Sequence, residues 1–399
     1  MKIAMVVPEY PPFTIGGGGV VFEALVGQLG SRHEVRVFSA CDPYRSWTQN
    51  LAPESTEVIR RYPLIPVAAG KPHLRSVLPP NPISAIQLIR DLASWRPDVG
   101  HLHGYGYSIV DMASLVLRWL TIPYIFTNHG YPVTPTSRSL AMRSLYRGYQ
   151  AIGAGPTNSH ALATTSISSD VANQDSALQH DRSLVIENGV TPLPDGTSED
   201  CQLMRDRFHV GDSIVIGAAG RLAWSKGFDT LIASLSSVSA RPIVCVIAGA
   251  DAGEMVPLSK QAAELPHGIR VVFPGQMNRE ELGVLFTLSS VIAVPSRDEP
   301  FGLVALEAMA LKRRVVATAV GGMKRFVEQP LGRLVAPDDP SSFASALNSA
   351  LTAPETPGES SQQQSILTSR SWSVIATSYE NLLADACEGA PSRHRNEPR

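Results

Sequence analysis

Short apolar segments of strand length alternate with helical stretches along the chain, and this pattern runs twice through its 399 residues. In the first half we predict helices at residues 20–29 and 83–95 and strands at residues 2–7, 34–38, 99–103, 124–127 and 183–186. In the second half we predict strands at residues 214–219, 243–248, 270–273, 291–294 and 315–318. Such alternation builds parallel sheets through right-handed crossovers, so the sequence predicts an α/β protein.

A segment rich in Pro, Gly and Asp, residues 188–198, separates the two halves and is typical of a linker. Because 399 residues exceed what one hydrophobic core usually organises, we predict two domains, the first over residues 1–188 and the second over residues 189–370. Residues 353–364 and 389–399 have compositions typical of weakly ordered chain.

The overall composition indicates an ordinary globular protein, with 44% hydrophobic residues, 18% charged residues and a formal net charge of −2. There is no basic excess for nucleic acid, and strong membrane steering is not expected. The four cysteines form no C-x-x-C pair, which favours a reducing cytoplasm over a zinc knuckle or a disulfide framework. Residues 108–126 approach the length of a bilayer span, but Asp111, Arg118 and Pro123 interrupt them, so we predict a helix followed by a buried strand.

Two carboxylates, Glu299 and Glu307, lie eight residues apart across a predicted junction between a loop and a helix. Between them Pro300, Phe301 and Gly302 end the loop, and the helical spacing starts near Gly302 and Leu303. The first N–H groups of that helix can hold a phosphate, and Gly302 allows close approach. A carboxylate such as Glu307 matches a pair of vicinal ribose hydroxyls, and Glu299 can do the same for a second sugar. The alternative is two solvated acids at the start of a helix.

Two cations, Arg221 and Lys226, lie five residues apart just after a predicted strand, with Gly220 and Gly227 beside them. The glycines permit a turn that aims both cations at one point, and a diphosphate carries the complementary charge. A solvated turn is the alternative. All these polar residues follow the carboxyl ends of predicted strands, where open parallel sheets bind their ligands.

A run of glycines, residues 16–19, follows the first predicted strand and precedes a helix. Bare backbone N–H groups at Gly16 and Gly17 could meet an anion, although a hinge or a flexible turn is also open. A dinucleotide fingerprint fails, because Val21 and Phe22 stand where its last glycine is needed, and the chain has no phosphate-binding P-loop motif.

Histidines mark the ends of two predicted strands. His101 and His103 point the same way from one strand, which suggests either a metal site or packed histidines. We favour packed histidines, because no third ligand is evident. His129 lies just past the next strand, where an active-site side chain would emerge, although a lone histidine is more often structural.

Six motifs in this order make the chain similar to the family-4 retaining glycosyltransferases of the GT-B fold. The six are residues 16–19, 98–103, 127–130, 185–190, 220–227 and 299–307. The resemblance implies two Rossmann-like, doubly wound domains that face each other across a cleft. It also implies a last helix, near residues 371–386, that crosses back to the N-terminal domain, so residues 371–399 join residues 1–188.

The resemblance also implies roles for individual residues. Glu307 is expected to hold the ribose of the donor, and Arg221 and Lys226 its diphosphate. Glu299 is expected to orient the transferred sugar, and His129 to lie near the reaction centre. Backbone donors are expected from Gly16, Gly17, Gly302 and Leu303, with Phe301 in the same donor-binding set. Two residues depart from the family pattern, because Thr191 and Arg325 stand where acids are frequent.

The expected function is that of a hexosyltransferase, which moves a sugar from a nucleoside diphosphate sugar to an acceptor hydroxyl with retention of configuration. The sequence has no D-x-D motif, so we expect no metal and no cofactor. A sugar-nucleotide hydrolase or epimerase and a non-catalytic sugar-nucleotide-binding protein are the alternatives.

The sequence leaves the acceptor open between a glycan, a lipid-linked compound and a small molecule. Residues 44–82 are the expected acceptor region, where the basic residues Arg60, Arg61, Lys71 and Arg75 either meet a phosphorylated acceptor or form a solvated surface. We expect no nucleic-acid partner and at most peripheral membrane contact. The donor base, the transferred sugar and the oligomeric state are not predicted.

Overall fold

The computed structural model describes residues 1–11, 17–41, 48–50, 58–63, 82–130, 144, 148, 155–173, 182–240 and 242–389. The chain divides into two compact units, which are treated separately here. Residues Met1–Glu187 and Trp372–Arg399 form the first unit, and residues Asn188–Ser371 form the second. These bounds differ by one residue from the domain limits expected from the sequence.

The first unit contains an eight-stranded sheet in the order β3-β4-β2-β1-β5-β6-β7-β8. Its neighbouring strands are parallel except for the pair β3 and β4, which is antiparallel. The strands are β1 (Lys2–Val7), β2 (Glu34–Cys41), β3 (Thr48–Asn50), β4 (Val58–Pro63), β5 (Val99–His103), β6 (Tyr124–Asn128), β7 (Thr164–Ser166) and β8 (Ser183–Val185).

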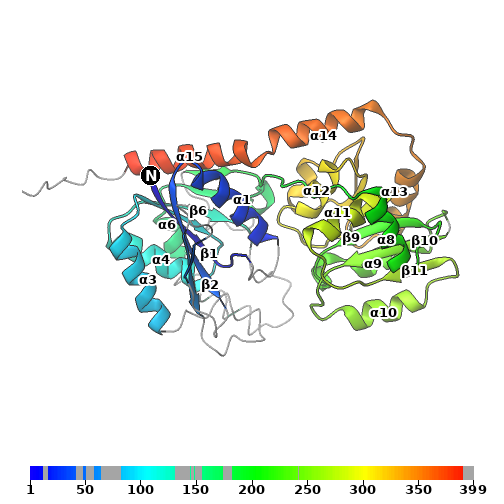
Figure 1. The fold of residues 1–399 in the computed structure, drawn as a ribbon, viewed down its shortest axis with the longest axis horizontal. Helices are drawn as coiled ribbons and strands as arrows, with labels where there is room; N and C mark the ends of the chain where they lie inside the picture. The colour runs from blue at the N-terminus through cyan, green and yellow to red at the C-terminus, as the bar shows by residue number, and fades with distance from the viewer. Residues whose placement is uncertain are drawn as a thin grey trace, which may run out of the picture. The chain divides into compact units, whose positions relative to one another are not determined.

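Helices cover both faces of this sheet (Figure 1). One face packs its alternate residues, among them Val6 and Leu102, against α3 (Pro82–Trp95) and α4 (Ser108–Trp119). The other face contacts α15 (Trp372–Glu388), which also packs against α1 (Gly18–Gly30). Two short helices, α6 (Gly155–Ser159) and α7 (Ser169–Asn173), complete the described helices of this unit.

The second unit contains a six-stranded, fully parallel sheet in the order β11-β10-β9-β12-β13-β14. Its strands are β9 (Ile214–Ala219), β10 (Ile243–Ala248), β11 (Ile269–Val272), β12 (Val291–Val294), β13 (Val315–Thr318) and β14 (Gly332–Val335). Counted from β9, this is the 3-2-1-4-5-6 order of a doubly wound fold. The direction of winding therefore reverses between β9 and β12.

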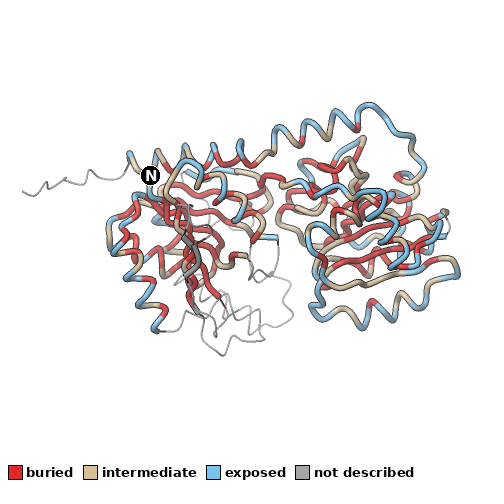
Figure 2. Tube along the Cα trace, in the orientation of Figure 1, coloured by how far each residue is buried: buried red, intermediate tan, exposed pale blue. Residues whose placement is uncertain are grey.

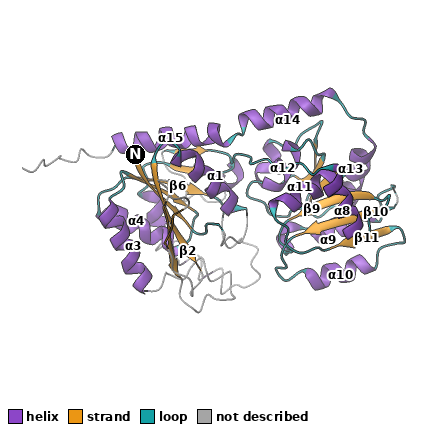
Figure 3. Ribbon diagram, viewed as in Figure 1, coloured by secondary structure: helices purple, strands orange, loops and turns teal. Residues whose placement is uncertain are grey.

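Helices on both faces of the second sheet bury its strands (Figures 2 and 3). They are α8 (Ser198–Arg207), α9 (Phe228–Leu235), α10 (Met255–Ala263), α11 (Arg279–Leu288), α12 (Leu303–Ala310), α13 (Pro340–Thr352) and α14 (Pro357–Ser369), with the 3-10 turns η4 (Trp224–Lys226) and η5 (Gly321–Arg325). Capping residues stabilise the N-termini of several of these helices. Asn278 and Glu281 form a capping box on α11, and the Asp339 side chain accepts from the Ser342 N–H of α13.

The predicted fold class is confirmed, and six predicted strands have the bounds found in the structure, namely β1, β5, β9, β10, β12 and β13. Residues 108–126 form α4 followed by β6, as predicted, and no helix in the described part of the chain is long and apolar enough to span a bilayer.

The predicted weak order of residues 353–364 is wrong, because α14 begins at Pro357. Its polar side chains find partners within the unit. Glu359 pairs with Arg314 at 2.9 Å, and the Gln362 side chain accepts from the Leu331 N–H at 2.9 Å. The composition of this segment indicated disorder only because these partners are distant in sequence. Most of residues 389–399 lie outside the described residues.

Candidate functional site

The loops that follow β9 and β12 lie side by side at the point where the second sheet reverses its winding. The Ser225 carbonyl in the first loop accepts from the N–H groups of Arg297 and Asp298 in the second, at 2.8 and 3.2 Å. Gly227 has a φ of 63°, and a Cβ at that position would lie 2.1 Å from the Pro295 carbonyl oxygen. The two loops can therefore approach this closely only because residue 227 is glycine.

Lys226 and Glu299, one from each loop, form an ion pair. Lys226 Nζ donates to Glu299 Oε2 at 2.5 Å, and the two side chains are 22% and 15% exposed. Burial, followed by the charge of Glu299, raises the pKa of the neighbouring Asp298, while Lys226 acts in the opposite sense. The sequence analysis assigns Lys226 to the diphosphate and Glu299 to the transferred sugar, and the structure places the two side chains in contact. Arg221, the other predicted cation, is exposed in the same loop as Lys226.

Glu307 lies on α12, is 9% exposed, and pairs with a residue that the sequence analysis missed. Arg279, the first residue of α11, donates from Nη1 to Glu307 Oε1 at 2.8 Å and from Nη2 to the Thr191 carbonyl at 2.7 Å. Burial raises the pKa of Glu307, and Arg279 opposes this rise. Only one oxygen of Glu307 is engaged by Arg279, so the other can accept from a ligand hydroxyl. Thr191, one of the two departures from the family pattern, thus helps to hold Arg279 through its backbone carbonyl.

The start of α12 has no side-chain cap. Gly302 is its N-cap residue, with a φ of 101°, and a Cβ there would lie 2.3 Å from Met323 Cγ. The N–H groups of the first turn, which begins at Leu303, are therefore available to a ligand. Phe301 is 2% exposed, and its ring centroid lies 5.4 Å from that of Phe326, so it anchors the turn from the core side.

Gly321 and Gly322 support the backbone that carries Glu299. The Gly322 N–H donates to the Pro300 carbonyl at 3.2 Å, and a Cβ on Gly321 would lie 1.6 Å from the Glu299 carbonyl oxygen. Gly321 also has a φ of 52°. Arg325, the second departure from the family pattern, is exposed at the end of η5.

We expect Gly321→Ala to destabilise the protein more than Gly211→Ala. Both glycines have a left-handed φ, 52° and 56°, but a Cβ on Gly211 meets nothing within 4 Å. Gly211→Ala should therefore cost only the conformational strain, about 1 kcal/mol, while Gly321→Ala adds the clash with Glu299. Urea unfolding of both variants measures the difference. Equal losses of stability would contradict this prediction, because they would show that the backbone around Glu299 moves away from the added Cβ at no energetic cost.

The three histidines of the first unit form one cluster. The ring centroids of His101 and His103 are 3.9 Å apart, which confirms that they share a face of β5, and His103 Nδ1 lies 2.9 Å from His129 Nε2. Phe22 of α1 and Tyr379 of α15 pack against the cluster. Among the described residues no group of three His, Cys, Asp or Glu side chains could hold a metal ion. The arrangement is that of packed histidines.

Burial lowers the pKa of His101 and of His129 to about 3, and that of His103 falls well below its usual value. All three imidazoles are therefore neutral near pH 7. His129 is only partly exposed, and its hydrogen bond to His103 fixes its ring. A neutral, oriented imidazole can donate or accept one hydrogen bond, but it cannot supply a positive charge to a leaving group.

Two other predicted regions lie partly outside the described residues. Gly16 is outside them, while Gly17 is the N-cap residue of α1 and offers no side-chain cap. In the expected acceptor region, Lys71 and Arg75 are outside the described residues, whereas Arg60 and Arg61 lie on β4. Arg61 is 4% exposed and donates to the Pro11 carbonyl at 2.5 Å. The alternative of a solvated surface is therefore wrong for Arg61.

Two family models match consecutive parts of the chain. Residues 15–192 match Glycosyltransferase Family 4, and residues 202–365 match Glycosyl transferases group 1. The chain is 27% identical over 417 residues to glycogen synthase of Mycobacterium tuberculosis, covering 98% of this chain and 96% of the relative.

Solved structures that share the fold include the following two. Sucrose-phosphate synthase from Thermosynechococcus elongatus superposes with a TM-score of 0.74 at 21% identity, covering 96% of this chain and 98% of the other. HepE of Anabaena, in complex with UDP-glucose, superposes with a TM-score of 0.72 at 18% identity, covering 96% of this chain and all of the other (100%).

Proposed function

Because this chain belongs to the family-4 glycosyltransferases of the GT-B fold, which use nucleoside diphosphate sugars, we propose that it transfers the sugar to an acceptor hydroxyl with retention of configuration and without a metal ion. One observation carries this proposal. Lys226 and Glu299 meet at the point where the second sheet reverses its winding, beside the uncapped start of α12. Open α/β sheets bind their ligands at such a point.

In this proposal the donor replaces the internal partners of the site. Its diphosphate takes the ammonium group of Lys226, with Arg221 and the first N–H groups of α12 as further donors. A hydroxyl group of the donor sugar then donates to Glu299, which has lost Lys226. Two ribose hydroxyls donate to Glu307, whose second oxygen is not held by Arg279. Lys226, Glu299 and Glu307 thus each have a partner in the ligand.

The reaction forms a bond between the acceptor oxygen and the anomeric carbon, and it breaks the bond between that carbon and the phosphate oxygen. The leaving phosphate oxygen takes the proton of the acceptor hydroxyl on the same face of the sugar. Negative charge grows on the diphosphate as the bond breaks, and fixed cations and N–H groups stabilise it. Lys226 and Arg221 would do here what a divalent ion does in sugar-nucleotide enzymes with a D-x-D motif, which this sequence lacks. His129, as a neutral imidazole, would contact the donor sugar.

A thermal-shift panel in EDTA tests the donor and the metal independence together. We expect one family among the UDP, GDP, ADP and dTDP sugars to stabilise the protein by about 2.7 kcal/mol at 100 times its dissociation constant. The matching nucleoside monophosphate is the control, because it lacks the second phosphate. Stabilisation that needs added Mg²⁺ would contradict the metal-free proposal.

Product analysis with the donor that binds then tests the reaction. An acceptor glycoside with the anomeric configuration of the donor, measured by proton NMR coupling constants, is the expected product. Free sugar or an isomeric nucleotide would indicate a hydrolase or an epimerase, and binding without turnover would indicate a non-catalytic protein.

We also propose a reducing, cytoplasmic location. None of the four cysteines, all of which are among the described residues, forms a disulfide, which supports this proposal.

A further inference from the structure

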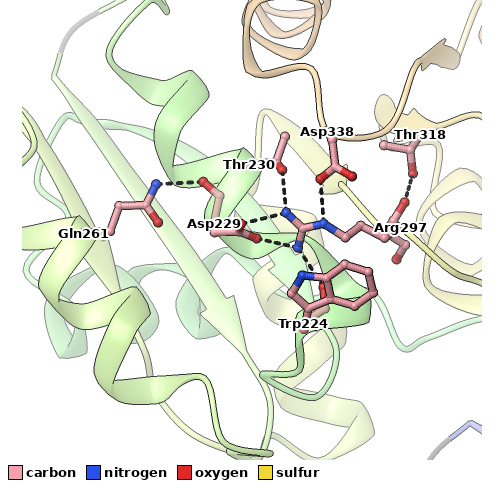
Figure 4. A network of polar contacts seen from close by, with 8 residues as sticks. Trp224, Asp229, Thr230, Gln261, Arg297, Thr318 and Asp338 are labelled. Carbon is pink, nitrogen blue, oxygen red and sulfur yellow. Dashed lines mark hydrogen bonds and ion pairs between the residues drawn. The ribbon is translucent and has the colours of Figure 1, made fainter. Parts of the chain in front are cut away.

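The Arg297 side chain donates five hydrogen bonds beside the candidate donor site (Figure 4). Its Nε donates to Asp338 Oδ1 at 2.6 Å. Nη1 donates to the Trp224 carbonyl and to Asp229 Oδ1, both at 2.8 Å. Nη2 donates to Asp229 Oδ2 at 2.7 Å and to Thr230 Oγ1 at 3.3 Å. A guanidinium has five N–H donors, and here each of the five has an acceptor.

These acceptors belong to three separate segments of the second unit. Trp224 lies in η4, whose last residue is Lys226, and Asp229 lies at the start of α9. Asp338 lies in the loop before α13. Arg297 itself precedes Glu299 by two residues in the loop after β12. One side chain therefore joins the segment that carries Lys226 to the segment that carries Glu299.

Further contacts hold the surroundings of Arg297 in place. The Arg297 guanidinium carbon lies 4.9 Å from the centre of the Trp224 ring, in the geometry of a cation–π contact. Gln261 of α10 donates to the Asp229 carbonyl at 2.9 Å, and the Thr318 hydroxyl donates to the Ser296 carbonyl (Figure 4). Asp229 is thus attached to α10 and the loop of Arg297 to β13, so the acceptors and the backbone around the Arg297 guanidinium are held in place.

The Arg297 side chain does not have the features of a ligand-binding group. It is 11% exposed, and all its N–H donors are already engaged, so a phosphate would have to displace Asp229 or Asp338. Lys226 differs, because it is 22% exposed and has a single carboxylate partner among the described residues. The burial and the full set of acceptors indicate a role in shaping the site.

We propose that Arg297 is a positioning residue, which sets the separation of Lys226 and Glu299 by holding their two loops against α9 and against the loop before α13 that contains Asp338. This inference rests on the proposed function for its catalytic consequence. It predicts that the planar fork, and not only the positive charge, is required at residue 297. A lysine has three N–H donors on one atom and cannot span Asp229, Asp338 and the Trp224 carbonyl together.

The test compares Arg297→Lys with Arg314→Lys. Arg314 is a matched control, because it is 13% exposed and donates to Glu359 and to the carbonyls of Ala350, Ala353 and Pro354. It immediately precedes β13, at the edge of the sheet opposite to the candidate site. Both variants replace a buried guanidinium fork by an ammonium group, so we expect both to lower the melting temperature.

The first measurement is hydrogen exchange of the two loops, which needs no substrate. We expect Arg297→Lys to accelerate exchange at residues 224–228 and 298–304 by about tenfold or more, and Arg314→Lys to leave those residues unchanged. Unchanged exchange in Arg297→Lys, or equal acceleration in both variants, would overturn the proposal.

The second measurement is turnover with the donor identified in the thermal-shift panel. We expect Arg297→Lys to lower kcat by about 10²-fold, because a misplacement of about 1 Å in a catalytic group has that effect, and to raise the KM for the donor. Arg314→Lys should keep the parent values at a temperature where it is folded. If the parent protein transfers no sugar from any donor, the proposed function fails, while the exchange comparison still decides whether Arg297 positions the loops.

Discussion

Lys226→Ala is expected to lower kcat by about 10²–10³-fold, because it removes a fixed cation from the place where charge grows on the leaving diphosphate. The protein should stay folded. Lys226 and Glu299 both keep some contact with water, at 22% and 15% exposure, so Glu299 can be hydrated once its partner is gone. The loss of stability should therefore lie below the about 3–5 kcal/mol of a fully buried pair.

Steady-state kinetics on the parent, on Lys226→Ala and on Lys260→Ala measure this effect. Lys260 is an exposed lysine on α10 of the same unit, so its replacement removes the same charge away from the candidate site. Lys260→Ala should keep the turnover of the parent. A Lys226→Ala variant that turns over within a few-fold of the parent would rule out the diphosphate contact.

Glu307→Ala is expected to weaken donor binding by about 10²-fold, because two hydrogen bonds from ribose hydroxyls to a carboxylate contribute about 3 kcal/mol together. At 100 times the dissociation constant of the parent, the stabilisation by the donor should then fall from about 2.7 to about 0.4 kcal/mol. Glu307→Ala also leaves Arg279 without its carboxylate, so part of the effect is a loss of stability. Isothermal calorimetry at a temperature where the variant is folded separates the two contributions.

Glu359→Ala is the matched control for this experiment. Glu359 is also a buried glutamate in an ion pair with an arginine, Arg314, but it lies on α14, away from the candidate site. It should lose stability and keep the response to the donor. A Glu307→Ala variant that binds the donor like the parent, or a Glu359→Ala variant that loses binding to the same degree, would contradict the ribose contact.

Apolar runs were sufficient to locate the central strands of both sheets, because a strand buried on both faces is a continuous apolar segment. Four strands, β3, β4, β7 and β14, gave no such signal. β7 consists of Thr164, Thr165 and Ser166, β14 contains Arg333, and β4 contains Arg60 and Arg61. β7 packs its polar side chains through hydrogen bonds, such as the bond from Thr165 Oγ1 to Thr127 Oγ1 at 2.8 Å. Their partners are tertiary, so the local pattern could not reveal these strands.

The candidate site was predicted as a set of residues, but its internal connections were not. Glu299, Glu307 and Lys226 could be placed at one edge of the sheet because carboxyl ends of parallel strands meet there. Arg279 was missed because it pairs with Glu307 across 28 residues of sequence. Arg297 lies two residues before the recognised segment 299–307, and its contact with Asp229 joins residues 68 positions apart. Nothing in local spacing indicates such pairs.

The position of α15 has a consequence for the synthesis of this protein. α15 packs against α1, β5 and β6, its Glu380 pairs with Arg32 at 2.7 Å, and the Tyr379 ring lies 4.8 Å from that of His101. These residues leave the ribosome only after all of residues 188–371, so the second unit can fold first although it is encoded later. Until then the part of the first sheet that α15 covers, at β5 and β6, lies open to water and to chaperones, and the unit that is begun first is completed last.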